Sequence, residues 1–362
     1  MNNQIIVERD DTKFNTDVFF SVDDKLPIMG MSIGFMPSWW NKRYGITFGE
    51  KYIFDPDYRV ETTRFKWKAI HERFPEINVG SNNPKPEFIR IDLHNAMTPA
   101  VAGCEVVYPE DGYPTSKILP LDKIETLELP KDMENTFPYN EIIKQTKYLN
   151  RKLNTDVSPF IFKNGILNDA VLLRGSDMFG DLVDENELAK KVMDYSYNIG
   201  IMEFDFNFKH KSMPEVMPLC NCTADLIGPR LYEIGQLDYD IRMINYLNAN
   251  NQKVMLHHCG FFDRFVTVYN KLPQLDMVQI GPDSSPRIAL EAFPNAHVDY
   301  CFSSVWLTSA SRSEVINKTN QLLDEARGNW HRFSVNIADI DVDMPESYLM
   351  DIYECIKKGE AK

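Results

Sequence analysis

The residues best suited to chemistry lie in one short segment, residues 253–260, where an apolar run ends in two histidines, a cysteine and a glycine. Such a run is typical of a buried strand. Side chains two residues apart on a strand point to the same face, so His257 and Cys259 can face one ion while His258 faces away. Imidazole and thiolate are preferred zinc ligands, and the spacing therefore predicts a metal site at the end of this strand.

A third soft ligand follows another apolar run, residues 296–300, which ends in Cys301. We expect this run to be a strand next to the first one. Two thiolates and one imidazole leave the fourth position of a zinc ion (Zn2+) open, as in catalytic sites. A lone Cys or His at a strand end is more often part of the core. It is the combination of three such residues that favours a metal.

Two further cysteines, Cys220 and Cys222, end a third apolar run that begins at residue 217. Alternation along a strand would put both cysteines on the same face, with Cys222 at the end of the strand and Cys220 deeper within the sheet. We therefore hold Cys222 as a reserve ligand for the same ion.

Composition limits the classes of function. The chain has 362 residues, with 39 Lys and Arg against 53 Asp and Glu, a formal net charge of −14. Such an acidic protein repels phosphate backbones, so we expect no nucleic-acid partner. Six scattered cysteines do not form a disulfide framework. We find no secretory signal and no membrane-spanning run, and expect a cytoplasmic protein with reduced thiols.

The order of apolar runs predicts the fold. Residues 1–150 are irregular, whereas residues 151–362 alternate strands with helices, which is typical of parallel β-α units. We expect a (β/α)8 TIM barrel whose main part is 151–362, with 1–150 as an N-terminal extension packed on it in one structural domain. The expected strands are 88–93, 158–162, 200–208, 217–222, 253–257, 277–280, 297–302 and 332–335, and the expected helices are 57–74, 138–153, 165–173, 185–198, 232–248, 262–271, 285–293, 311–327 and 345–356.

The barrel and the metal site support each other, because active sites of such barrels lie at the carboxyl ends of the strands. Other residues there are ambiguous. Trp39 and Trp40 could wall an aromatic substrate pocket or pack in the core. Asp225 could orient substrate or an imidazole, or cap a helix. The acidic run 339–343 is either a solvated loop or part of the rim.

The second half of the chain resembles the uroporphyrinogen decarboxylase superfamily, in particular its corrinoid-dependent methyltransferase branch. The matching motifs, in order, are Ser-Pro-Phe at 158–160, Leu-Leu-Arg-Gly at 172–175, Gly-Pro-Arg-Leu at 228–231, the segment 254–260, and Met-Pro-Glu-Ser-Tyr-Leu at 344–349. The resemblance implies a zinc ion bound through His257 and Cys259. True decarboxylases carry paired arginines near the N-terminus, and residues 29–43 lack them.

The spacing of the remaining ligands resembles one group within that branch. Thiol-methylating members have a Gly-Cys-Gly segment where this chain has residues 336–340, without cysteine. Widely spaced Cys259 and Cys301, with Glu233 ahead of them, are similar to the O-demethylase methyltransferases. That resemblance implies Cys301 and Glu233 as further metal ligands.

We therefore expect a methyltransferase that moves a methyl group from a methoxylated, aromatic small molecule to the cobalt of a corrinoid. The chain lacks a corrinoid-binding signature, so a separate corrinoid protein must carry that cofactor. Three alternatives stay open: a methyl-corrinoid:thiol methyltransferase, a metal-free decarboxylase-like protein, and a non-catalytic barrel with core cysteines. The sequence leaves the methyl donor and the oligomeric state open, with a homodimer as one option.

Overall fold

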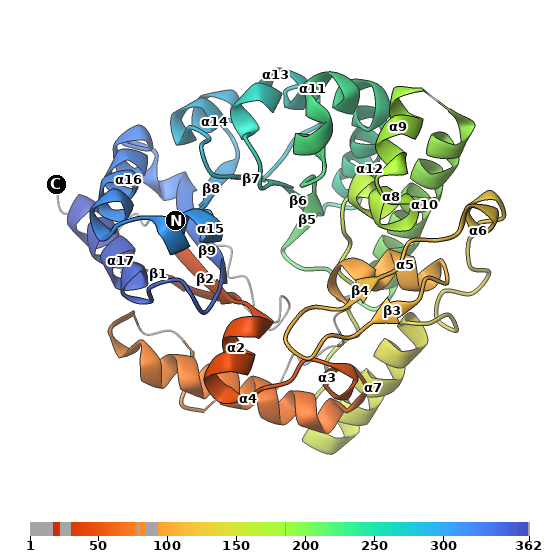
Figure 1. Cartoon of the computed structure of the whole chain (residues 1–362), viewed down its shortest axis with the longest axis horizontal. Coiled ribbons are helices and arrows are strands. Elements are labelled where there is room, and N and C mark those ends of the chain that lie inside the picture. Colours follow the sequence, from red (N-terminus) through yellow and green to blue (C-terminus); the bar gives the residue numbers. More distant parts are fainter. Residues whose placement is uncertain are drawn as a thin grey trace.

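A curled β-sheet with helices on its outer side forms the centre of the molecule (Figure 1). The computed structural model describes residues 17–21, 30–77, 80–83, 91, 93–184 and 186–360. The strand order in the sheet is β1-β2-β9-β8-β7-β6-β5. The strands are β1 (Asp17–Ser21), β2 (Gly30–Phe35), β5 (Val216–Cys220), β6 (Lys253–His258), β7 (Met277–Ile280), β8 (His297–Cys301) and β9 (Phe333–Ile340).

The sheet confirms the predicted fold class, an α/β fold of barrel type. Strands β2, β9, β8, β7, β6 and β5 run parallel, and β1 pairs with β2 in the antiparallel sense. Eight parallel strands were expected. The described part of the chain forms six parallel strands, of which five, β5 to β9, are among those expected. Strand β2 comes from the segment expected as an extension, and it pairs with β9.

Helices alternate with the strands along the second half of the chain and cover the outside of the sheet (Figure 1). A small hairpin of β3 (Val106–Val107) and β4 (Thr115–Ser116) lies within the first half. The helices are α2 (Pro37–Tyr44), α3 (Glu50–Phe54), α4 (Pro56–Arg73), α5 (Met97–Val101), α6 (Leu121–Glu125), α7 (Tyr139–Leu153), α8 (Ile166–Arg174), α9 (Asp177–Val183), α10 (Glu187–Lys209), α11 (Ala224–Gly235), α12 (Leu237–Ala249), α13 (Val266–Tyr269), α14 (Pro286–Ala292), α15 (Ser304–Ser309), α16 (Arg312–Glu325) and α17 (Ser347–Glu360).

One predicted strand, residues 200–208, is instead the second half of helix α10. Gly200, the first residue of the predicted strand, lies inside this helix. A Cβ atom at Gly200 would come within 2.8 Å of both Lys163 Cε and Met243 Cε. The glycine therefore allows close packing of the helix and does not end it.

The predicted strand at 158–162 does not form either. The N–H of Ile161 donates to Asn207 Oδ1 at 2.9 Å, and Asn207 Nδ2 donates to the Ile161 carbonyl at 2.7 Å. A side-chain amide of α10 thus satisfies the backbone groups that a neighbouring strand would have paired. The strand predicted at 88–93 lies mostly outside the described residues.

The two faces of β6 differ in what they contact. Val254 and Leu256 are fully buried in the main hydrophobic core, together with helix residues such as Ile244. Met255 points to the opposite face and belongs to a separate small cluster with Val216 and Met277. His257 follows Met255 by two residues, so it lies on this inner face of the curled sheet.

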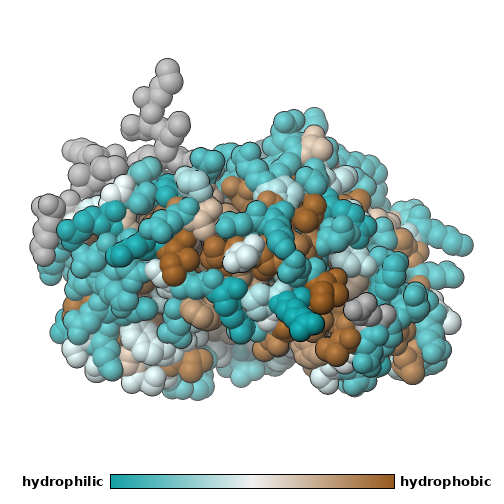
Figure 2. Space-filling model, turned by 90° about the horizontal axis from the view of Figure 1, so that it is seen from above, coloured by the Kyte–Doolittle hydropathy of each residue, from teal (hydrophilic) through white to brown (hydrophobic). Residues whose placement is uncertain are grey.

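The surface of the molecule is largely polar on the face that Figure 2 shows. Smaller hydrophobic areas lie between the polar ones. Within the described ranges, no helix combines the length and the apolar character needed to cross a bilayer.

Candidate metal centre

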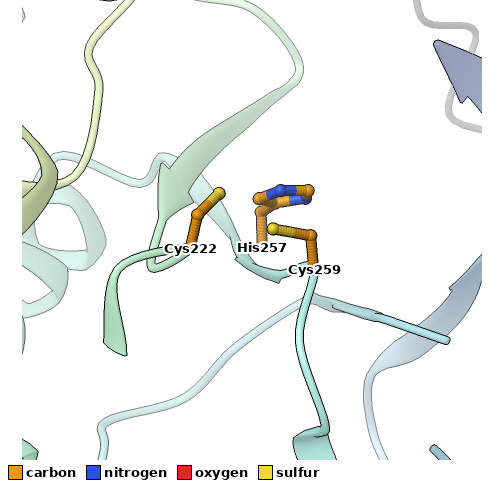
Figure 3. Close-up of side chains that lie close together, drawn as sticks. All are labelled: Cys222, His257 and Cys259. Atoms are coloured by element: carbon orange, nitrogen blue, oxygen red, sulfur yellow. The ribbon is translucent and has the colours of Figure 1, made fainter. Parts of the chain in front are cut away.

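Three side chains with soft ligand atoms meet at the carboxyl ends of β5 and β6. The ligand atoms of Cys222, His257 and Cys259 all lie within 4.8 Å of one another. Figure 3 shows the three side chains pointing toward a common point. His257 and Cys259 come from the end of β6, and Cys222 comes from the turn between β5 and α11. The close approach of two thiols and one imidazole fits a zinc ion with one coordination position left open.

The strand register explains why Cys222 reaches this site. Cys220 and His257 are partners in the parallel β5–β6 pair. The N–H of Asn221 then donates to the carbonyl oxygen of His257 at 2.7 Å. Cys222 lies two residues beyond Cys220, as Cys259 lies two residues beyond His257, so the two thiols come level with each other.

Two glycines make room for the loop that carries Cys259. A Cβ atom at Gly260 would overlap with the side chain of Asp225, and a Cβ atom at Gly281 would overlap with the Cys259 carbonyl group. A larger residue at position 281 would therefore displace the backbone of Cys259, and one at position 260 would displace the side chain of Asp225. The glycine of the His-His-Cys-Gly motif serves this close approach.

The thiols interact before any metal binds. Hydrogen bonding to Cys222 and then burial raise the pKa of Cys259 well above its usual value, and the neighbouring His257 opposes this only in part. Cys259 is therefore a protonated thiol near neutral pH in the metal-free protein. A metal ion must displace this proton, which couples binding to pH.

His258, the other histidine of the motif, faces away from this cluster, as predicted. It is fully buried on the helix side of β6, where its Nδ1 lies 2.8 Å from the hydroxyl of Tyr269. Burial lowers the pKa of His258 to about 4, so the ring is neutral.

The structure does not bring Cys301 into the cluster, and it places the reserve ligand Cys222 there instead. Cys301 ends β8, and β7 lies between β6 and β8. Two strand spacings amount to about 10 Å, too far for Cys301 to share an ion with Cys259 without backbone movement. Strand β5, by contrast, is the direct neighbour of β6.

Glu233 also lies away from the cluster. It is half-exposed on α11 and forms an ion pair with Lys271. The interpretation of Glu233 as an acidic ligand is therefore not supported by its position.

Trp39 and Trp40 pack in the core and do not line an open pocket. Both side chains are fully buried in α2, and the ring centroid of Trp39 lies 4.4 Å from that of Phe35. Of the two interpretations of these residues, packing is the correct one.

Asp225 holds the Cys259 loop in place. Its Oδ1 accepts the N–H of Phe261 at 3.2 Å and pairs with Arg264 at 2.6 Å. It lies in the first turn of α11, whose N-cap is Thr223. Asp225 therefore positions the segment after the metal ligands and is not the helix cap.

One residue near the site has no clear signal in the sequence. The pairing of β2 with β9 shifts between Ile337 and Ile340, so β9 contains a bulge, and Asp339 within it has a φ of 61°. Loss of hydration raises the pKa of the Asp339 carboxyl group, and the charges of His94 and His257 lower it. A bulge changes the direction of the side chains within it, and Asp339 therefore does not follow the alternation of β9.

His94 is the second unforeseen neighbour. Its φ of 49° is unusual for a residue with a side chain, and its ring stacks on Tyr113 at a centroid distance of 4.3 Å. Strained backbone of this kind is concentrated at functional sites. Asp339 thus interacts electrostatically with both His94 and the candidate ligand His257.

Comparisons with known proteins agree with the fold. No protein-family model matches the sequence, and no curated protein matches it significantly. Among solved structures, a methyltransferase from Methanosarcina mazei superposes with a TM-score of 0.62 at 12% identity, covering 94% of this chain and 98% of that one. A B12-independent methionine synthase from Shewanella sp. W3-18-1, in complex with selenomethionine, gives 0.43 at 10% identity over 76% of this chain and 80% of that one. The first similarity shows a shared fold over nearly the whole chain.

Proposed function

We propose that this protein is a zinc-dependent methyltransferase, with the ion held by Cys222, His257 and Cys259. The observation that carries the proposal is the meeting of these three ligand atoms within 4.8 Å at the carboxyl ends of parallel strands. That is the place where barrel enzymes keep their active sites. The fold shared with a methyltransferase from Methanosarcina mazei supports the same reaction class.

The favoured reaction is demethylation of a methoxylated, aromatic compound, with the methyl group passed to the corrinoid of a partner protein. An ether is a poor methyl donor because its leaving group is a basic oxygen. Zinc supplies a Lewis acid for that oxygen. The protein's own residues fix the geometry, and Asp339, whose carboxyl group interacts electrostatically with His257, is the candidate to supply a proton to the departing oxygen.

A second candidate is methylation of a thiol from a methylated corrinoid. The absence of a cysteine in residues 336–340 counted against it in the sequence. The position of Cys222 weakens that objection, because a two-thiol, one-imidazole set is complete without a cysteine in β9. Sulfur ligands also suit a zinc-bound substrate thiolate.

One experiment separates these reactions. The purified zinc-loaded protein is mixed with a corrinoid protein reduced to the cobalt(I) state and with methoxybenzenes, methanol, methylamines or methyl thioethers in turn. The absorbance change on cobalt methylation is recorded, and the demethylated product is identified. We expect activity with methoxybenzenes that is lost in Cys259→Ala.

The same mixture is then run in reverse, from methylated corrinoid to a panel of thiols. Turnover only in that direction would replace the first candidate with the second. A protein that binds zinc but transfers no methyl group in either direction would contradict both.

A further inference from the structure

A row of polar side chains crosses the inner face of the sheet at the level of the metal centre. In the strand register His257 pairs with Gln279, Gln279 with Asp299, and Asp299 with Ser334. Register partners in a parallel sheet point to the same face, so these side chains on β6, β7, β8 and β9 are neighbours. Each is hydrogen-bonded to the next.

The direction of these hydrogen bonds follows from Asp299. A carboxylate only accepts hydrogen bonds. Gln279 Nε2 donates to Asp299 Oδ2 at 2.5 Å, which turns the Oε1 atom of the same amide toward His257. An amide oxygen only accepts, so the His257 Nδ1 atom beside it must carry the proton. The Nε2 atom of His257 is then the unprotonated nitrogen, the form in which an imidazole binds a metal ion.

Burial makes this arrangement hard to reverse. Gln279 and Asp299 expose only 4% and 2% of their surfaces. A flipped amide would turn its oxygen toward the Asp299 carboxylate. These two acceptors would repel each other whichever nitrogen of His257 carried the proton, and neither buried group could turn to water instead.

The Asp299 carboxylate, at the far end of the row from His257, is held by hydrogen bonds as well. The hydroxyl of Ser334 donates to the second oxygen of Asp299, and His297 Nε2 lies 2.7 Å from that hydroxyl. Asp299 is thus held from β7 and from β9, which fixes the carboxylate against which the Gln279 amide is oriented.

We propose that Gln279 and Asp299 are positioning residues of the metal centre. They hold His257 as the Nδ1–H tautomer, with Nε2 directed at the thiols of Cys222 and Cys259. The inference rests on the proposed zinc site, but it makes a separate statement about the metal-free protein. Partners behind a ligand histidine typically change metal affinity by about 10- to 100-fold.

The tautomer can be measured without metal. In 15N-labelled, zinc-free protein, long-range 1H–15N correlation spectra distinguish protonated from unprotonated ring nitrogens, and the His257 signals are assigned by their loss in His257→Asn. We expect a protonated Nδ1 and an unprotonated Nε2 at pH 8, and a mixture of tautomers in Gln279→Met. A predominant Nε2–H form in the unmodified protein would overturn the proposal.

Zinc affinity tests the consequence. By competition with a chromogenic chelator, Gln279→Met and Asp299→Asn should each bind zinc about 10- to 100-fold more weakly than the unmodified protein. The double variant Q279E/D299N exchanges carboxylate and amide. It still offers an acceptor to Nδ1–H and a donor between β7 and β8, so we expect it to regain most of the affinity.

Gln145→Met is the matched control. Gln145 is equally buried, and its amide donates to the Ile53 carbonyl at 3.1 Å, but it lies between α3 and α7. Gln145→Met should lower the melting temperature and leave zinc affinity unchanged.

Two results would overturn the positioning role. One is an unchanged zinc affinity in Gln279→Met, and the other is a double variant that binds zinc no more tightly than Asp299→Asn. An unmodified protein that binds no zinc would contradict the proposed function, and the tautomer would still decide the hydrogen-bond inference.

Discussion

Asn221 donates its backbone N–H to the carbonyl oxygen of His257 at 2.7 Å, which continues the β5–β6 pairing beyond the end of β5. This one bond fixes the turn that follows β5 relative to the strand that carries two candidate ligands. Cys222 is the next residue in that turn. The third ligand of the site is therefore set by backbone pairing between direct neighbours, and its position does not depend on a distant loop.

The first prediction concerns the ligand set. Cys222→Ser and Cys259→Ser should each lose most bound zinc, because removal of one of three protein ligands severely weakens a site. Cys301→Ser should retain about one zinc per chain. The measurement is metal content by atomic emission after dialysis against a weak chelator. Zinc lost in Cys301→Ser and kept in Cys222→Ser would restore the ligand set that the sequence favoured.

The sequence predicted strands most reliably where a short apolar run can only be a buried strand. The apolar run before His257 predicts a strand ending at the metal ligands, and β6 ends at His258. The run at residues 277–280 coincides with β7. The sequence favoured Cys301 and kept Cys222 as a reserve ligand, because both cysteines lie at strand ends and their spacing does not rank them. The choice depends on which strand is the direct neighbour of β6, and this is a property of the sheet.

Other features of the site give no pattern in the sequence. Gln279 and Asp299 look like ordinary polar residues in strands, and their roles depend on alignment across four strands. Asp339 lies in a bulge of β9, which interrupts the alternation on which a sequence pattern depends. The strand predicted at 200–208 was wrong because close packing against Lys163 and Met243 at Gly200 is a tertiary contact.

The second prediction concerns the loop that carries Cys259. Gly281→Ala should lower both stability and zinc affinity, because the new Cβ atom would overlap with the Cys259 carbonyl group. The Cys259 backbone must shift to make room for the methyl group, and we expect a loss of about 1–3 kcal/mol in unfolding free energy. Gly180→Ala in α9 is the control, since no atom lies within 4 Å of a Cβ atom there. Equal zinc affinity in both variants would contradict this role of Gly281.

The third prediction concerns Asp339. Asp339→Asn keeps the shape of the side chain but cannot deliver a proton, so turnover should fall by about 10-fold or more. Zinc content should not change, because Asp339 is not one of the three clustered ligands. Asp343→Asn, an exposed aspartate after the same strand, is the control. If both variants kept full activity, Asp339 would have no part in the reaction.

The fourth prediction concerns the pH dependence of zinc binding. Because hydrogen bonding to Cys222 and burial raise the pKa of Cys259, zinc must displace a thiol proton near neutral pH. Apparent zinc affinity should therefore rise as pH rises from 6 to 8, by about one decade per pH unit for each proton released. Calorimetry in buffers of different ionisation enthalpy counts these protons. Binding without proton release would show that the thiols are already ionised.

The last prediction concerns Glu203, a fully buried carboxyl group in α10. Tyr139 donates its hydroxyl to Glu203 Oε1 at 2.8 Å, and Lys163 Nζ lies 3.8 Å from Oε2. Burial raises the pKa of Glu203 from 4.5 to about 7, because the loss of hydration outweighs the attraction of the Lys163 ammonium group. The folded protein therefore holds this proton more tightly than the unfolded chain does.

The sign of the pH effect follows from that difference. Below about pH 4.5 Glu203 is protonated in both the folded and the unfolded protein, and it does not change the free energy of unfolding. As the pH rises toward 7, Glu203 ionises first in the unfolded chain, and the folded protein loses stability. Glu203→Gln keeps an oxygen that accepts from Tyr139 and cannot ionise, so its stability does not fall for this reason. The difference in unfolding free energy between the variant and the unmodified protein should therefore grow by about 1–3 kcal/mol, in favour of the variant, as the pH rises from 4.5 to 7. Denaturant unfolding at several pH values measures the difference, with the exposed Glu128→Gln as control. Parallel curves for the unmodified protein and Glu203→Gln would mean that the Lys163 ammonium group compensates the buried charge fully.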